Sequence, residues 1–169
     1  VGGGADVGIQ RARHELAGDI VSVGDRVTKF KKGDRVVAGN SAPCGDCYFC
    51  TRDLENLCED LLFNNGAYAE FIRIPGRIVQ KNLLRLKPET DFSDAALVEP
   101  LACVVQGVED AQLRAGQRVL VIGAGPIGLM FVALARHLGC QVTVSGRGKK
   151  RLEIARRLGA DLVPNVSEQ

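Results

Sequence analysis

The sequence predicts an α+β unit rich in antiparallel strands, followed by an α/β unit built on a parallel sheet. Three observations predict this order. Apolar and polar residues alternate over residues 18–38 and are interrupted by Gly-Asp turns. A cysteine-rich loop follows at residues 42–60, and from Gln117 onward continuous apolar runs alternate with helical patterns. The change of pattern predicts two domains, at residues 1–110 and 111–169.

In the first unit, the alternation at residues 18–38 predicts paired strands. The sequence GAYAEFIRIP predicts strand structure that ends at Pro75, because proline cannot donate a backbone hydrogen bond. Helical spacing extends from Ser93 to Val108, with Ser93 as the expected N-cap. Pro100 lies within this segment and predicts a break or a restart of the helix, since proline is tolerated in a first helical turn.

The second unit reads as strand, helix, strand, helix and the start of a third strand. The expected elements are residues 118–123, 126–138, 141–145, 149–159 and 160–164. The first strand is a continuous apolar run, typical of a buried parallel strand, and Gly139 is expected to end the first helix. This order is half of a doubly wound sheet, so the chain is expected to be a fragment or a truncated protein.

Composition limits the function. The formal net charge of +2 and the aromatic content of 5% give no general electrostatic basis for nucleic-acid binding. The N-terminus lacks a signal-peptide core and no apolar run approaches a membrane span, so we expect a cytoplasmic protein without nucleic-acid or membrane partners. In the reducing cytosol, six cysteines point to metal binding before disulfides.

Four cysteines have the spacing C-x2-C-x2-C-x7-C, at Cys44, Cys47, Cys50 and Cys58. Four thiolates can surround one tetrahedral zinc ion and leave no position for substrate, so the pattern predicts a structural zinc lobe. A bacterial iron–sulfur motif would have a shorter last gap and a following proline. Acids in the loop disfavour a nucleic-acid module, and four unrelated buried cysteines are the remaining alternative. Cys103 and Cys140, in apolar contexts, are expected in the core.

Gly123, Gly125 and Gly128 form the pattern G-x-G-x-x-G, with Pro126 and Ile127 between the last two glycines. The pattern follows a predicted strand and opens a predicted helix, which lets a pyrophosphate approach bare backbone at the helix N-terminus. It therefore predicts a dinucleotide site formed by these five residues. A tight turn without a ligand is the alternative.

The end of the second strand bears on the choice of dinucleotide. An acidic residue there would bind the ribose 2′-hydroxyl of NAD, but the chain has Ser145 at this position. Gly146 and Arg147 follow it, and Arg151 lies in the next helix. Guanidinium groups suit a 2′-phosphate, which favours NADP over NAD and makes Gly146, Arg147 and Arg151 candidate cofactor residues. A solvated basic helix start is the alternative.

Six motifs follow one another along most of the chain. They are HExxG at residues 14–18, VGDRVTKFKKGDRVV, the four-cysteine lobe, GAYAEF, Glu-Pro-Leu-Ala at residues 99–102, and GAGPIG. In this order they resemble the zinc-dependent medium-chain dehydrogenases of the alcohol dehydrogenase superfamily, and most closely the sorbitol and threonine dehydrogenase branch. The resemblance implies a GroES-like catalytic domain that carries the lobe, followed by a partial Rossmann domain that binds NAD or NADP.

The resemblance also implies a site. His14, Glu15 and Glu99 match the family's catalytic positions and are candidate ligands of a catalytic zinc. Such a zinc acts as a Lewis acid on a substrate hydroxyl while hydride passes to the nicotinamide. The implied function is an oxidoreductase for a secondary alcohol or polyol, in a family that often forms homo-oligomers.

The N-terminal segment departs from the family's pattern. At the positions of a ligand cysteine, a proton-relay hydroxyl and a histidine, the alignment places Gly3, Ala5 and Gly8. None of these side chains can bind metal or relay a proton. An alternative function is therefore a catalytically inactive, truncated remnant of such a dehydrogenase that retains the structural zinc lobe.

Overall fold

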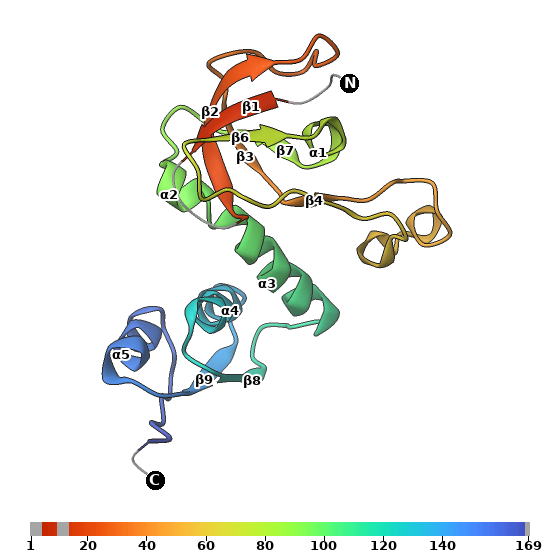
Figure 1. Ribbon diagram of the computed structural model, residues 1–169. Coiled ribbons are helices and arrows are strands. Elements are labelled where there is room, and N and C mark those ends of the chain that lie inside the picture. The colour runs from red at the N-terminus through yellow and green to blue at the C-terminus, as the bar shows by residue number, and fades with distance from the viewer. Residues whose placement is uncertain (1–4, 10–13, 168–169) are drawn as a thin grey trace. The chain divides into compact units, whose positions relative to one another are not determined.

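The computed structural model describes residues 5–9, as backbone, and residues 14–167. The contacts within the chain divide it into two units, Val1–Glu99 and Pro100–Gln169. The division lies in the first turn of helix α3 (Val98–Asp110), whereas the boundary expected from sequence lies at the other end of this helix. Among the described residues the two units share no sheet (Figure 1), and each has its own hydrophobic core.

A five-stranded antiparallel sheet in the order β6-β1-β2-β3-β7 forms the centre of the first unit. Its strands are β1 (Ala5–Ile9), β2 (Leu16–Val23), β3 (Arg35–Ala38), β6 (Phe71–Ile74) and β7 (Leu83–Arg85). The pairing of β2 with β3 confirms the paired strands expected at residues 18–38. Strand β6 ends directly before Pro75, as expected.

Both faces of β2 are covered. Leu16 and Ile20 point to one face and pack in a core that includes Ile78 of helix α1 (Gly76–Lys81). Ala17 points to the other face, where it packs with Val37 and with Ala95 of helix α2 (Phe92–Ala95). The period of two along the strand therefore joins the sheet to a helix on each side.

The helical segment after the sheet is broken before Pro100, but the N-cap expected at Ser93 is wrong. The carboxylate of Asp91 caps α2 by accepting hydrogen bonds from the Ser93 N–H at 2.7 Å and from its hydroxyl at 2.6 Å. An ionised carboxylate is the stronger acceptor, so Ser93 serves as the donor within the first turn. Pro100 then lies in the first turn of α3, where a missing N–H is tolerated.

The second unit confirms the doubly wound order. Strands β8 (Arg118–Ile122) and β9 (Gln141–Ser145) pair in parallel, and helices α4 (Pro126–His137) and α5 (Lys149–Arg157) follow them. The expected third strand is present as two parallel bridges beside β9, at Leu162 and Asn165. Gly139, with a φ of +83°, follows the end of α4 as expected.

Burial departs from expectation at two places in the second unit. Leu120 and Ile122 on β8 are 60% and 83% exposed, because they alternate with the buried Val121 and point to the face of the sheet away from the core. Cys140 is buried as expected, but Cys103 is exposed. On α3 it is the next residue, Val104, that points into the interior, so Cys103 faces outward. Among the described residues, no helix combines the length and apolar character needed to cross a bilayer.

Asp34 organises the long loop between β2 and β3. Its carboxylate accepts hydrogen bonds from the Lys31 N–H at 2.9 Å and from the Arg85 guanidinium at 2.8 Å. Arg85 also donates to the Lys29 carbonyl at 2.9 Å. The Lys31 N–H and the Arg85 guanidinium hold the pKa of Asp34 below its ordinary value.

We expect Asp34→Asn to lower the thermal unfolding temperature at neutral pH. A carboxyl whose pKa is lower in the folded than in the unfolded state stabilises the fold above its ordinary pKa of about 4. That contribution is lost as the pH falls through the lower folded-state pKa, so the melting curves of variant and parent should converge in acid. Asp25→Asn, at an exposed carboxylate of the same loop, controls for net charge. If Asp34→Asn lowered the unfolding temperature by the same amount at every pH, this explanation would be contradicted.

Candidate functional site

The cysteine lobe is a loop closed by a short sheet. Strands β4 (Ser41–Ala42) and β5 (Leu62–Phe63) pair antiparallel and bring the two ends of the loop together. Between them the chain forms two short 3₁₀ turns, η1 (Cys50–Arg52) and η2 (Glu55–Leu57), seen beyond β4 in Figure 1. Tyr48, Leu54 and Leu57 are exposed, so the lobe buries little apolar surface of its own.

The four sulfur atoms of the lobe lie in one cluster. The Sγ atoms of Cys44, Cys47, Cys50 and Cys58 all lie within 4.8 Å of one another. Cys44 Sγ is 3.5 Å from Cys58 Sγ and 3.8 Å from Cys50 Sγ. A tetrahedron with Zn–S bonds of about 2.3 Å has edges of about 3.8 Å. The donor set and its spacing therefore fit a closed, four-thiolate zinc site.

Ionisation of the cluster depends on its surroundings. The backbone N–H groups of Cys50 and Glu59 lower the pKa of Cys47 to about 6. A hydrogen bond with the Asp46 side chain raises the pKa of Cys44 to about 12, and burial raises the pKa of Cys50. Four thiolates this close together repel one another, so a divalent cation would displace the remaining protons as it binds.

Helix α1 ties the lobe to the rest of the first unit. Arg77 donates to the carbonyl and to the carboxylate of Asp60, each at 2.8 Å. Lys81 lies 3.2 Å from the Glu55 carboxylate. In addition, the Cys44 N–H donates to Cys58 Sγ at 3.2 Å, a contact that joins the two ends of the lobe.

A second cluster of metal-binding side chains includes residues distant in sequence. His14 and Glu15 directly precede β2, and Glu99 lies in the first turn of α3. One ligand atom from each lies within 4.8 Å of the others, with His14 Nε2 3.3 Å from Glu15 Oε1. All three residues are partly buried. One imidazole and two carboxylates fit a three-ligand zinc site with an open position. Gly3, aligned with the family's cysteine, lies outside the described residues.

The glycine loop joins β8 to α4 through a close backbone approach. Gly123 has a φ of +109°, and its N–H donates to the Ser145 carbonyl at 2.7 Å. A Cβ on Gly128 would lie 2.0 Å from the Gly123 carbonyl oxygen, so only glycine fits there. A Cβ on Gly125 would meet nothing within 4 Å. The loop thus presents bare backbone beside open space at the N-terminus of α4.

Pro126 and Ile127 begin α4, and Ile127 is 46% exposed. An open, largely apolar pocket of about 600 Å³ lies against the loop, and its lining includes Gly123, Gly125, Pro126, Ile127 and Gly128. The predicted five residues therefore share one concave surface. A ligand bound there would contact backbone and apolar side chains together.

The junction between β9 and α5 lies beside the glycine loop. A Cβ on Gly146 would come within 3.0 Å of the Ala124 Cβ and 3.1 Å of the Ala124 nitrogen. Arg147 and Arg151 follow from this junction and are exposed. Because β8 and β9 are parallel, their carboxyl ends meet at the same edge of the sheet. The structure thus brings Gly146 against the loop and places both arginines on the adjoining segment.

Replacement of Cys47 tests the lobe. We expect Cys47→Ser to abolish stoichiometric zinc binding by the lobe and to lower the unfolding temperature, because the lobe has little core to replace the ion. Zinc would be measured by mass spectrometry after dialysis. Cys103→Ser, at an exposed cysteine outside the cluster, should leave both quantities unchanged. Equal zinc content in the two variants would rule out the cluster as the site.

Two glycine variants separate folding from binding at the loop. Gly128→Ala should destabilise the second unit by about 1–3 kcal/mol, because its methyl group collides with backbone. Gly125→Ala should fold normally, since its φ of −81° suits alanine and its Cβ meets open space. The same methyl would occupy the space of a pyrophosphate, so dinucleotide affinity should fall. Chemical denaturation measures the stability, and nucleotide titration measures the affinity. A destabilised Gly125→Ala, or a Gly128→Ala as stable as the parent, would contradict the assignment.

Both units of the chain match known protein families. The profile of the alcohol dehydrogenase GroES-like domain matches residues 10–85, and that of the zinc-binding dehydrogenases matches residues 126–169. D-altritol 5-dehydrogenase of Agrobacterium fabrum is 38% identical over 92% of this chain and 47% of its own length. Sorbitol dehydrogenase of Bacillus subtilis is 34% identical over 92% of the chain and 45% of its own length. The chain thus spans about half the length of these curated relatives.

Solved structures share the fold. A protein from Sinorhizobium meliloti 1021, solved bound to NADP, superposes with a TM-score of 0.89 at 26% identity, covering 99% of this chain and 56% of its own. An alcohol dehydrogenase from Escherichia coli CFT073, solved with NADH, has a TM-score of 0.88 at 27% identity with the same coverage. A GroES-like unit with its cysteine lobe and a Rossmann-type unit stand in the same order in this chain. The chain belongs to the zinc-dependent medium-chain dehydrogenases of the alcohol dehydrogenase superfamily.

Proposed function

We propose that this protein transfers hydride between a secondary alcohol or polyol and NADP, with residues 1–110 as the catalytic domain and 111–169 binding the dinucleotide. The polyol assignment is supported by the altritol and sorbitol dehydrogenases among the relatives. The observation that carries the proposal is the contact of the β9–α5 junction with the glycine loop at Gly146 and Ala124. This contact supports a shared site for phosphate groups, because it joins the glycine loop to the segment that carries Arg147 and Arg151.

The first turn of α5 supports NADP over NAD. Lys149, Lys150 and Arg151 occupy this turn, and it holds no acidic residue. Three cations at the positive end of a helix dipole are unfavourable unless an anion is bound nearby. A 2′-phosphate beyond Ser145 would meet Arg147 and Arg151, whereas the 2′-hydroxyl of NAD would find no carboxylate at the end of β9. The solved relatives include one bound to NADP and one bound to NADH, so the choice depends on these side chains.

In the catalytic domain, His14, Glu15 and Glu99 would hold the zinc ion. When bound, zinc supplies a Lewis acid that lowers the pKa of a substrate hydroxyl. His14 would bind through a neutral nitrogen, and the two carboxylates offset the charge of the cation. Both glutamates are partly buried, which strengthens their attraction for a cation relative to a fully exposed pair. The four-cysteine lobe has a closed donor set, so a zinc ion held there would contribute to stability alone.

A second candidate function is a catalytically inactive remnant that retains the structural zinc lobe. Gly3, Ala5 and Gly8 favour it, since they stand where the family has a ligand thiolate, a relay hydroxyl and a histidine. Both functions keep the lobe and the glycine loop. They differ in whether His14, Glu15 and Glu99 hold a metal ion and whether the protein turns over a substrate.

Nucleotide titration tests the cofactor assignment. We expect NADPH to bind at least about tenfold more tightly than NADH, because guanidinium groups pair with the 2′-phosphate. Arg147→Gln combined with Arg151→Gln should abolish this preference while leaving NADH affinity unchanged. Arg156→Gln combined with Arg157→Gln, at the other end of α5, removes the same charge and should keep the preference. Tighter binding of NADH by the parent chain would overturn the assignment.

Metal content and turnover distinguish the two functions. A chain that binds a second zinc ion, lost in Glu99→Gln, and that reduces NADP with sorbitol or other polyols supports the dehydrogenase. A chain that holds zinc only through the cysteine lobe and shows no turnover, with intact NADPH binding, supports the remnant. Zinc content and turnover are measured on the same purified chain, and intact NADPH binding distinguishes an inactive remnant from a misfolded preparation.

A further inference from the structure

A pocket on the first unit is lined by cations and includes none of the candidate metal or dinucleotide ligands. We propose that this pocket binds a small organic phosphate. It has a volume of about 620 Å³ and two walls, residues 26–29 of the β2–β3 loop and residues of α1 between Gly76 and Gln80. Among its lining residues, Arg26, Lys29 and Arg77 are cationic and none is acidic. Arg77 also pairs with Asp60, which does not line the pocket, so Arg26 and Lys29 supply the rest of the positive charge of the lining.

The walls of the pocket are held in place by the core. Val79 is buried, and Val27 packs against the same core cluster of the first unit. The Val27 N–H closes a turn onto the Gly24 carbonyl at 2.9 Å. The Lys29 carbonyl accepts a hydrogen bond from Arg85 at 2.9 Å. The backbone that carries the cationic side chains is therefore held in place, so a ligand would have to order the side chains but not the loop.

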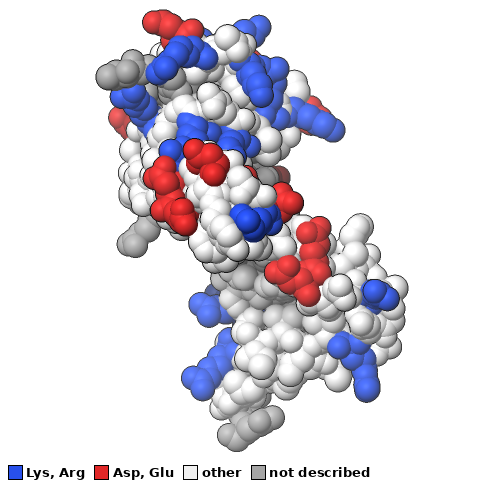
Figure 2. Space-filling view, turned by 90° about the vertical axis from the view of Figure 1, so that its right-hand side faces the viewer, with Lys and Arg blue, Asp and Glu red and all other residues white. Residues whose placement is uncertain are grey.

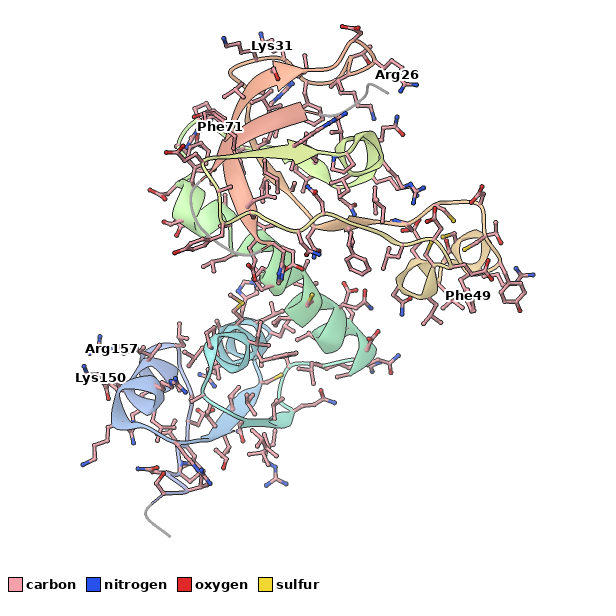
Figure 3. All side chains as sticks on the ribbon, in the orientation of Figure 1. Arg26, Lys31, Phe49, Phe71, Lys150 and Arg157 are labelled. Atoms are coloured by element: carbon pink, nitrogen blue, oxygen red, sulfur yellow. The ribbon has the colours of Figure 1, made fainter. Side chains whose placement is uncertain are left out.

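Arg77 is an oriented donor on the α1 wall. Its two hydrogen bonds to Asp60, both at 2.8 Å, set the direction of the guanidinium. Asp60 also raises the pKa of Arg77, so this group stays charged at every working pH. Arg26 and Lys29 bring charge from the opposite wall. Figure 3 labels Arg26 on the β2–β3 loop, and Figure 2 shows Lys and Arg side chains over this part of the first unit.

The donors of the pocket determine the class of ligand. Guanidinium and ammonium groups donate hydrogen bonds and accept none, and the Thr28 hydroxyl and Gln80 amide add further donors. A phosphate monoester matches this set, because its oxygens accept several charge-assisted hydrogen bonds. Val27 and Val79 offer apolar contact to a short carbon skeleton. The volume lies in the range of small-molecule sites, so the pocket suits a phosphate carried on a small organic group.

Backbone-amide NMR of the full chain, titrated with glycerol 3-phosphate, tests the proposal. We expect saturable shifts at residues 26–29 and 76–80, and no such shifts with neutral glycerol. Inorganic phosphate should bind the same residues more weakly, because it lacks the carbon skeleton. The signals of residues 123–128 are followed separately, so that binding at the dinucleotide loop is not mistaken for binding at this pocket. The outcome is therefore independent of the proposed function.

Charge-removing variants complete the test. Arg26→Gln combined with Lys29→Gln should weaken glycerol 3-phosphate binding at least about fivefold, since two charge-assisted hydrogen bonds are lost. Lys32→Gln combined with Arg73→Gln removes the same charge from exposed positions outside the pocket and should bind like the parent. Equal affinity in both double variants, or saturable shifts absent from residues 26–29 and 76–80 in the parent, would overturn the proposal.

Discussion

The close backbone approach between Gly123 and Gly128 is the constraint on which the candidate dinucleotide site depends. No Cβ fits 2.0 Å from the Gly123 carbonyl, so α4 can begin against the end of β8 only if residue 128 is glycine. This start puts the first turn of α4, whose N–H groups have no partner within the helix, beside the open space at Gly125. The parallel pairing of β8 with β9 then brings the next strand-to-helix junction to the same edge, where Gly146 contacts Ala124.

In the first unit, helix α1 links three features that are separate in the sequence. Its buried face packs Ile78 and Val79 into the core of the sheet. Its polar face holds the cysteine lobe, through Arg77 to Asp60 and Lys81 to Glu55. The same face forms one wall of the cationic pocket. The lobe buries little apolar surface, so its position depends on the β4–β5 pairing, on these ion pairs and on the ion that its four sulfur atoms are spaced to hold.

Most of the fold was predictable because its signals are local. The alternation at 18–38, the apolar run of β8 and Gly139 each act through neighbouring residues, and each element is where it was expected. Predictions were wrong where a competing contact decided the outcome. Asp91 caps α2 in place of Ser93 because a carboxylate accepts two hydrogen bonds at once, and Cys103 is exposed because Val104 occupies the inward face of α3.

The sequence by itself determined the sites whose residues are close along the chain. The spacing of the four cysteines and the glycine pattern name their members, because a short loop brings them together whatever surrounds it. The family resemblance grouped His14, Glu15 and Glu99, but only the tertiary structure decided that sites assembled from distant segments come together. The ligand atoms of these three residues lie within 4.8 Å of one another, and residues 26–29 meet α1 because both pack on one core. Local periodicity carries no information about such contacts, since they depend on how the sheet and its helices pack.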